Sequence, residues 1–195
     1  MRPSREELLR IVRTFYPSGV QQGDPAYLTS SEILRLEHVR EEASAYAGRA
    51  RWASVLRRIG TELPGHVVED WTYTVPLNCW RCRVYLPGAT LREANQTKDA
   101  VSVVGLVSIF APVHVVYSSM QRREGDRFLP SRTLYQPLPE TEHAQGVLER
   151  TLRSELHTDA VEADALFTPI PDISCFNIPH GRAMLIDALF TDDRW

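Results

Sequence analysis

The chain has few of the residues that stabilise a small fold by covalent bonds. Only three of its 195 residues are cysteines, Cys79, Cys82 and Cys175. Such a small and odd number of cysteines argues against a disulfide framework. A chain of this length buries roughly 70% of its unfolded surface, so an apolar core is enough to hold it together. We therefore expect one domain, residues 1–195, that needs no disulfide and no structural metal.

Long apolar runs are missing as well. The most apolar stretch, residues 101–117, is interrupted by serine, glycine, proline and histidine and stays below the roughly 18–20 apolar residues that cross a bilayer. The first seven residues are rich in charge and carry neither the apolar centre nor the cleavage site of a signal peptide. The sequence therefore predicts a cytoplasmic protein with no membrane partner.

Lysine is almost absent, because Lys98 is the only one and all other basic residues are arginine. This bias is typical of a GC-rich genome and indicates a bacterial source. Selection for bidentate binding of phosphate is the alternative explanation.

Charge is distributed unevenly along the chain. Residues 139–195 hold four arginines and eleven acidic residues, a net charge of −7, whereas residues 1–65 and 66–138 each carry +2. An acidic field of this kind repels nucleic-acid phosphates and attracts a basic protein. A solvated surface that only aids solubility is the other interpretation. The distribution argues against a nucleic-acid partner.

The familiar catalytic and cofactor-binding motifs are lacking too. The chain has no P-loop, no GxGxxG and no G-x-S-x-G, and Ser174-Cys175 does not sit in a nucleophile elbow. Cys79 and Cys82 form a CxxC, but they fall in a predicted strand, where residues three apart point to opposite faces. No second ligand pair accompanies them. We therefore expect no cofactor, no metal and no catalytic residue that the sequence identifies.

Among the histidines, His114 stands out because it lies in an apolar predicted strand. A hydrogen-bonded core histidine and a catalytic base with a perturbed pKa are both consistent with that position. His157 lies close to Asp159 in sequence, which is the kind of neighbourhood that a short loop produces by chance. The sequence leaves the role of His114 open.

Capping boxes and apolar spacing predict helices at the start of the chain. Ser4 with Glu7 opens the first helix. Thr29 with Glu32 opens a long helical stretch, which either kinks or divides into two helices near Gly48.

Strands are predicted next. Alternating or continuous apolar segments indicate strands from residue 67, over 80–86, 101–110 and 113–119, and more weakly over 133–136. A late helix begins near residue 139, and a last strand is expected over 183–190. This order predicts an α+β fold with N-terminal helices, a mainly antiparallel sheet of about five to six strands, one late helix and a C-terminal strand.

The alternation also predicts which side chains face inward. From residue 67 the odd positions are assigned to the core. In the next strand the parity inverts, with Trp80, Cys82, Val84 and Leu86 on one face and Arg81, Arg83 and Tyr85 on the other. The odd inward positions are Val67, Trp71, Tyr73 and Val75. One shared core is expected to contain Trp80, Val84, Leu86, Val103, Val107 and Val115.

Two short segments resemble uncharacterised bacterial proteins of about this length. They are Tyr27-Leu28-Thr29-Ser30-Ser31-Glu32 with Arg35-Leu36, and the ending with Pro171-Asp172-Ile173, Asn177, Gly181, Leu185, Ala188-Leu189-Phe190 and Asp192-Asp193-Arg194-Trp195. Some of those proteins look like immunity proteins of polymorphic or contact-delivered toxin systems. Immunity families bind and do not catalyse, so the resemblance implies a binding protein and transfers no functional residue.

The favoured hypothesis is a non-enzymatic protein-binding module, an immunity protein that neutralises a basic toxin domain. The alternatives are a small hydrolase-like enzyme with a site around His114, and a structural or regulatory subunit. The residues expected to contact a partner are the late acidic ones with the terminal aromatic: Glu155, Asp159, Glu162, Asp164, Asp192, Asp193 and Trp195.

Overall fold

The computed structural model describes residues 2–72, 78–87, 98–124, 127–128, 132–175 and 178–191. Two helices open this part of the chain. α1 (Arg5–Phe15) begins with the predicted capping box, in which the Ser4 hydroxyl accepts a hydrogen bond from the Glu7 amide at 3.2 Å and the Glu7 carboxylate accepts one from the Ser4 amide at 2.7 Å. The short α2 (Pro25–Leu28) is capped by Asp24. Local sequence therefore determines how the chain starts.

The long helical stretch is two helices, α3 (Ser31–Ser44) and α4 (Tyr46–Glu62), joined by an extended Ala45. The N-cap of α3 is Ser30, whose hydroxyl accepts a hydrogen bond from the Ile33 amide at 3.2 Å, so the predicted cap at Thr29 was wrong by one residue. The predicted break near Gly48 is confirmed. A Cβ on Gly48 would lie 2.4 Å from the carbonyl oxygen of Ala43, so only glycine permits this tight turn.

A mainly antiparallel sheet follows, in the order β1-β2-β3-β4-β5, and β6 and β7 also pair with β4. Among the strands that the structure describes, β7 alone runs parallel to its neighbour. The strands are β1 (Val67–Asp70), β2 (Cys79–Tyr85), β3 (Lys98–Ser108), β4 (Val113–Glu124), β5 (Arg127–Phe128), β6 (Arg132–Leu134) and β7 (Asp159–Ala160). The described residues therefore form the α+β fold that the sequence predicts.

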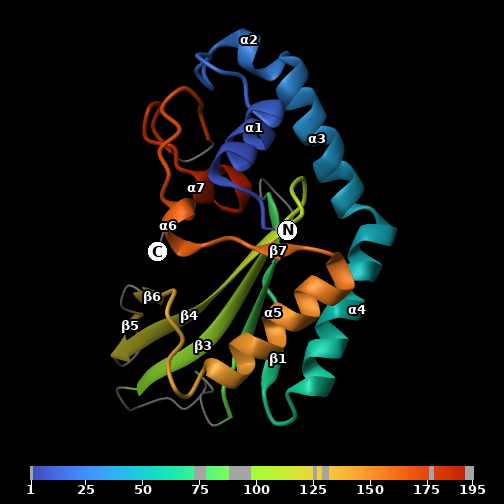
Figure 1. Ribbon diagram of the computed structural model, residues 1–195, viewed down its shortest axis with the longest axis vertical. Helices are drawn as coiled ribbons and strands as arrows, with labels where there is room; N and C mark the ends of the chain where they lie inside the picture. The colour runs from blue at the N-terminus through green and yellow to red at the C-terminus, as the bar shows by residue number, and fades with distance from the viewer. Residues whose placement is uncertain are drawn as a thin grey trace.

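Two apolar clusters lie on opposite faces of this sheet. α4 and α5 (Glu142–Leu156) cover one face, and Figure 1 shows the two helices side by side across it. Leu148 and Leu152 of α5 come so close to β3 that a Cβ on Gly105 would lie 3.3 and 3.5 Å from them. The second cluster lies on the other face and joins strand residues to α1 and α7 (Leu185–Leu189). Figure 1 shows these two helices packed together beyond the ends of the strands.

The predicted alternation of β2 is confirmed. Cys82 and Val84 belong to the cluster under α4 and α5, and Trp80 and Leu86 pack against it, whereas Cys79 belongs to the cluster around α1 and α7. The two thiols of the CxxC therefore point to opposite faces of the sheet. This is the geometry on which the sequence argument against a shared metal or disulfide depends.

Two predictions about strand faces were wrong. Val115 lies in the cluster around α1 and α7, because Val107 pairs with His114 and Leu106 pairs with Val115. Directly opposed residues share a face, so Val115 cannot share a core with Val107. In β1 the even residue Val68 packs on the core and Val67 is 44% exposed.

Trp71 follows the odd parity of β1. Its ring lies 4.2 Å from the guanidinium of Arg83, on the face that carries the arginines of β2. The predicted inward position of Trp71 was therefore wrong as well. Tyr73 and Val75, which were assigned to the same face, fall outside the described residues.

The predicted C-terminal strand is a helix. Met184 makes only an isolated bridge to Pro169, and the chain then turns into α7. The carboxylate of Asp187 accepts a hydrogen bond from the Met184 amide at 2.7 Å and closes the first turn. All five residues of α7 are buried, and a short apolar run with no polar face has no periodicity that separates a strand from a helix. The small α6 (Ala163–Leu166) also lay outside the predicted elements.

Candidate binding site

A cavity of about 720 Å³ is lined by residues of α3, α4, β1 and β2. α3 contributes Leu36, Glu37, Arg40 and Glu41, α4 contributes Arg49 and Trp52, and β1 and β2 contribute Asp70, Cys79 and Trp80. The tight turn at Ala45 and Gly48 sets the angle between the two helices and so brings these side chains around one space. The volume is in the range of small-molecule and side-chain pockets.

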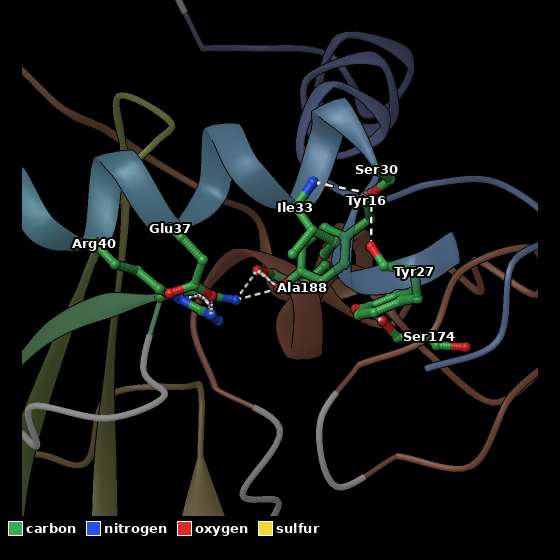
Figure 2. A network of polar contacts seen from close by, with 9 residues as sticks. Tyr16, Tyr27, Ser30, Ile33, Glu37, Arg40, Ser174 and Ala188 are labelled. Carbon is green, nitrogen blue, oxygen red and sulfur yellow. Dashed lines mark hydrogen bonds and ion pairs between the residues drawn. The ribbon is translucent and has the colours of Figure 1, made fainter. Parts of the chain in front are cut away.

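One end of the cavity is a network of hydrogen bonds centred on Asn78. Its side-chain oxygen accepts hydrogen bonds from Nη2 and Nε of Arg40 at 2.7 and 3.2 Å, and Arg40 also pairs with Glu37. Its side-chain nitrogen donates to the hydroxyl of Tyr16 and to the carbonyl of Ala188 at 2.8 Å. Figure 2 shows Arg40 and Glu37 projecting from α3 toward this network. A single amide thus ties α3, the end of α1, β2 and α7 together.

Tyr27 forms a second contact at this end. Its hydroxyl donates a hydrogen bond to the carbonyl of Ser174 at 2.8 Å, and the two residues lie close together in Figure 2. The contact links α2 to the C-terminal loops. Both ends of the chain therefore help to build this part of the wall.

The other end of the cavity is aromatic. The rings of Trp52 and Trp80 stack with centroids 5.9 Å apart and planes at 13°. Nε1 of Trp52 donates to Oδ1 of Asp70 at 3.1 Å, and the amide of Thr72 donates to the same oxygen at 2.9 Å. Two indoles, a carboxylate and a strand edge are thereby held in one arrangement.

Three buried ionisable groups of the wall, Cys79, Tyr27 and Tyr16, have raised pKa values. Burial raises the pKa of the Cys79 thiol to about 12, and burial raises the pKa of the Tyr27 phenol to about 12. Burial also raises the pKa of Tyr16 well above its ordinary value. A general acid or base works best with a pKa near the ambient pH, and a nucleophilic cysteine needs its thiolate. These three groups keep their protons at neutral pH and offer shape and hydrogen bonds.

His114 is completely buried. Its Nδ1 lies 2.9 Å from the hydroxyl of Thr158, and Nε2 has no hydrogen-bond partner within the described part of the chain. Burial, together with the nearby Arg153, lowers the pKa of His114 to about 4. The ring is therefore neutral at physiological pH and out of contact with solvent, as in a core histidine.

The late acidic residues lie beside arginines from distant parts of the chain. Glu155 pairs with Arg58 of α4 at 2.7 Å. Glu162 pairs with Arg2 at 3.2 Å, and Asp164 lies 3.9 Å from Arg5. Asp159 lies on β7, next to β4. Glu162 and Asp164 are thus brought together at the N-terminus, whereas Glu155 is held by α4; Asp192, Asp193 and Trp195 fall outside the described residues.

Sequence reasoning missed the cavity and one Ser–His contact. Oγ of Ser174 lies 2.9 Å from Nδ1 of His180, near the bridge between Cys175 and Ile178. Ser174 is 3% exposed. For the cavity, the only local signal was the i, i+3 pair of Glu37 and Arg40 on one helix face.

Within the described ranges, no three His, Cys, Asp or Glu side chains group closely enough to hold a metal ion. In the same residues no helix combines the length and the apolar character needed to cross a bilayer. Comparisons with protein-family models, with curated proteins and with solved structures find no match to this chain.

Proposed function

We propose that this chain is a non-enzymatic protein-binding module of the immunity type, which neutralises a toxin domain by holding part of its surface in the cavity under α3 and α4. The observation that carries the proposal is the cavity itself, a preformed space walled by two stacked tryptophans, a buried tyrosine and a fixed arginine. Tryptophan, tyrosine and arginine are the residues most enriched among those that dominate binding energy in protein interfaces.

The hydrogen bonds of the wall support this function. Arg40, Asn78 and Tyr16 already hold one another, so a partner meets side chains whose positions are fixed before it arrives. Fixing side chains in advance lowers the entropy cost of association. The wall also presents protonated cysteine and tyrosine, which fits a surface for recognition.

The choice of partner follows from charge and from the sequence resemblance. Residues 139–195 carry a net charge of −7, which favours a basic partner over a nucleic acid. Residues within 27–36 and 171–195 resemble uncharacterised bacterial proteins, some of which look like immunity proteins. Tyr27 and Asp172, which belong to these segments, form contacts that join the two ends of the chain.

Co-expression tests this proposal. If the proposal is correct, a gene beside this one should encode a toxin domain that arrests growth of a bacterial host, and co-expression of the wild-type chain should restore growth. Trp80→Ala should weaken both protection and direct binding by about tenfold or more, as expected for a residue that dominates binding. Leu34→Ala is the control, because Leu34 is exposed on α3 and does not line the cavity.

Thermal unfolding of each variant separates lost binding from lost folding. If Trp80→Ala does not fold, Glu41→Ala, which changes an exposed residue of the cavity wall, replaces it. Protection that survives in every folded cavity variant at wild-type strength would contradict the proposal.

A further inference from the structure

We propose that the tryptophan end of this cavity binds a cationic side chain, arginine or lysine, which the partner inserts between the indoles and the carboxylates of Asp70 and Glu41. The inference rests on the proposed function for the protein that supplies this side chain. The chemistry of the ligand follows from the cavity alone.

The indole wall supplies the first half of the recognition. Trp52 is almost fully buried, and Trp80, stacked on it, is only half-buried and lines the cavity. An indole ring attracts a cation that lies over its face, and a guanidinium also stacks on it. The same contact occurs elsewhere in the molecule, where the guanidinium of Arg83 lies 4.2 Å from the ring of Trp71.

Carboxylates supply the second half. Oδ1 of Asp70 accepts two hydrogen bonds, from Trp52 and Thr72, which hold the group in place at the edge of the cavity. Among the described residues, Oδ2 of Asp70 accepts none and the Glu41 side chain makes no ion pair. A cationic side chain over the indoles would therefore find a fixed carboxylate oxygen with open hydrogen-bonding capacity.

The balance of charge decides the sign of the ligand. Glu37 and Arg40 neutralise each other at the Asn78 end, where Arg40 is held by two hydrogen bonds. The remaining charged residues of the wall are Glu41 and Asp70, both negative, and Arg49. An anionic ligand would meet two carboxylates and one guanidinium, so the cavity favours a cation.

Short peptides test this chemistry without any knowledge of the partner. Calorimetric titration compares acetyl-glycyl-arginyl-glycinamide with the citrulline peptide, which has the same shape without the charge, and with the glutamate peptide. We expect the arginine peptide to bind about tenfold more tightly than the citrulline peptide, a difference of about 1.4 kcal/mol. The glutamate peptide should bind most weakly.

Three charge variants sharpen the test. Asp70→Asn keeps an oxygen for Trp52 and Thr72 but removes the charge, and it should lower affinity for the arginine peptide by about tenfold. Glu41→Gln should lower it by a smaller factor, and Glu42→Gln, an exposed change on α3 outside the cavity, should leave it unchanged. Arg49→Gln removes the nearby positive charge and should raise affinity.

Several results would overturn the inference: no binding of the arginine peptide, equal binding of the citrulline peptide, an unchanged affinity in Asp70→Asn, or weaker binding in Arg49→Gln. The last result would mean that the positive charge of Arg49 does not oppose the arginine peptide, contrary to the charge argument. Failure of this inference about a cationic ligand can be distinguished from failure of the proposed immunity function. Protection that depends on the cavity without any preference for cations overturns only this inference, and peptide binding without cavity-dependent protection overturns only the immunity role.

Discussion

Nε1 of Trp52 donates a hydrogen bond to Oδ1 of Asp70 at 3.1 Å, and this contact fixes the middle of α4 to the edge strand β1. The same oxygen accepts the amide of Thr72, so the end of the strand and the helix share one acceptor. The tryptophan end of the cavity thus depends on a side chain that also anchors the fold.

Removing the Nε1 donor of Trp52 should lower the free energy of unfolding of the protein. Trp52 is 2% exposed, and Trp52→Phe deletes both the hydrogen bond and part of a buried ring. We expect the free energy of unfolding to fall by about 2–4 kcal/mol, measured by denaturant titration. Asp70→Ala, which removes only the exposed acceptor, should cost about 1 kcal/mol. Equal losses in the two variants would show that packing of the indole contributes nothing beyond its hydrogen bond.

A matched pair of glycine substitutions tests the turn between α3 and α4. Gly48→Ala places a Cβ 2.4 Å from the carbonyl oxygen of Ala43, a backbone atom that cannot move without opening the turn. On Gly60, in the same helix, the nearest atom to an added Cβ is a methyl group of Val68 at 3.9 Å. Gly60→Ala should therefore stabilise the protein by about 0.5–1 kcal/mol through helix propensity. Gly48→Ala should destabilise it by about 2 kcal/mol or more, as overpacked sites do.

Denaturant titration of both variants gives the comparison, and fluorescence of the cavity tryptophans reports whether the turn has opened. A gain in stability from Gly48→Ala similar to that from Gly60→Ala would contradict the close contact at Ala43.

The local parts of this fold are the ones that the sequence predicts well. The capping box at Ser4, the break near Gly48 and the alternation along β2 each depend on residues that are neighbours in the chain. The α+β class follows from their order. In each case the interaction that decides the structure spans only a few residues.

Pairing between strands is where prediction from the sequence failed. Val107 and Val115 are both apolar and both odd, but the register sets Val107 opposite His114. A shift of one residue in register moves a whole strand to the other face, and no local pattern fixes it. The odd residues of β1 were misassigned for the same reason, and the fully buried α7 had no polar face to reveal its period.

The candidate site could not be predicted from local sequence. Its walls come from α1, α2, α3, α4 and the strands, and Asn78 connects groups as far apart in sequence as Tyr16 and Ala188. Composition gave the acidic C-terminal third, but the partners of Glu155 and Glu162 are arginines near the other end of the chain or in α4. Only the tertiary fold reveals which charges compensate one another.

The buried His114 predicts how stability depends on pH. Burial and Arg153 lower its pKa to about 4 in the fold, and Asp159 opposes the shift, whereas the ordinary value is 6.5. Between pH 6.5 and 4 the unfolded chain binds a proton that the folded chain does not, so the free energy of unfolding falls as the pH falls. The loss should reach about 3 kcal/mol by pH 4 and then stop, because both states are protonated below it.

Denaturant titrations across this range measure the slope. His114→Leu should flatten it, and His143→Gln, which changes an exposed histidine of α5, should leave it unchanged. Asp172 affects the free energy of unfolding in a different pH range. Its hydrogen bonds to Arg13 and Ser18 lower its pKa to about 2, so its stabilising effect is lost only below pH 3.8. A slope between pH 6.5 and 4 that persists in His114→Leu would assign the effect to other groups.

The last prediction concerns the acidic residues that the sequence assigned to a partner surface. If Glu155, Asp159, Glu162 and Asp164 attract a basic toxin domain, their neutralisation should slow association by about two- to tenfold and flatten its salt dependence, with less change in dissociation. The ion pairs add a sharper expectation, because Arg2 and Arg5 lie 3.2 and 3.9 Å from Glu162 and Asp164 and reduce their field. Arg2→Gln combined with Arg5→Gln should therefore speed association at low salt, which is the opposite change.

Trp195→Ala should act on dissociation if the terminal aromatic is a contact. Stopped-flow kinetics against the toxin domain at two salt concentrations measure all of these rates, and Glu32→Gln with Glu42→Gln on α3 controls for net charge. Association rates that follow net charge alone, whichever residues carry it, would mean that these acids form no specific surface.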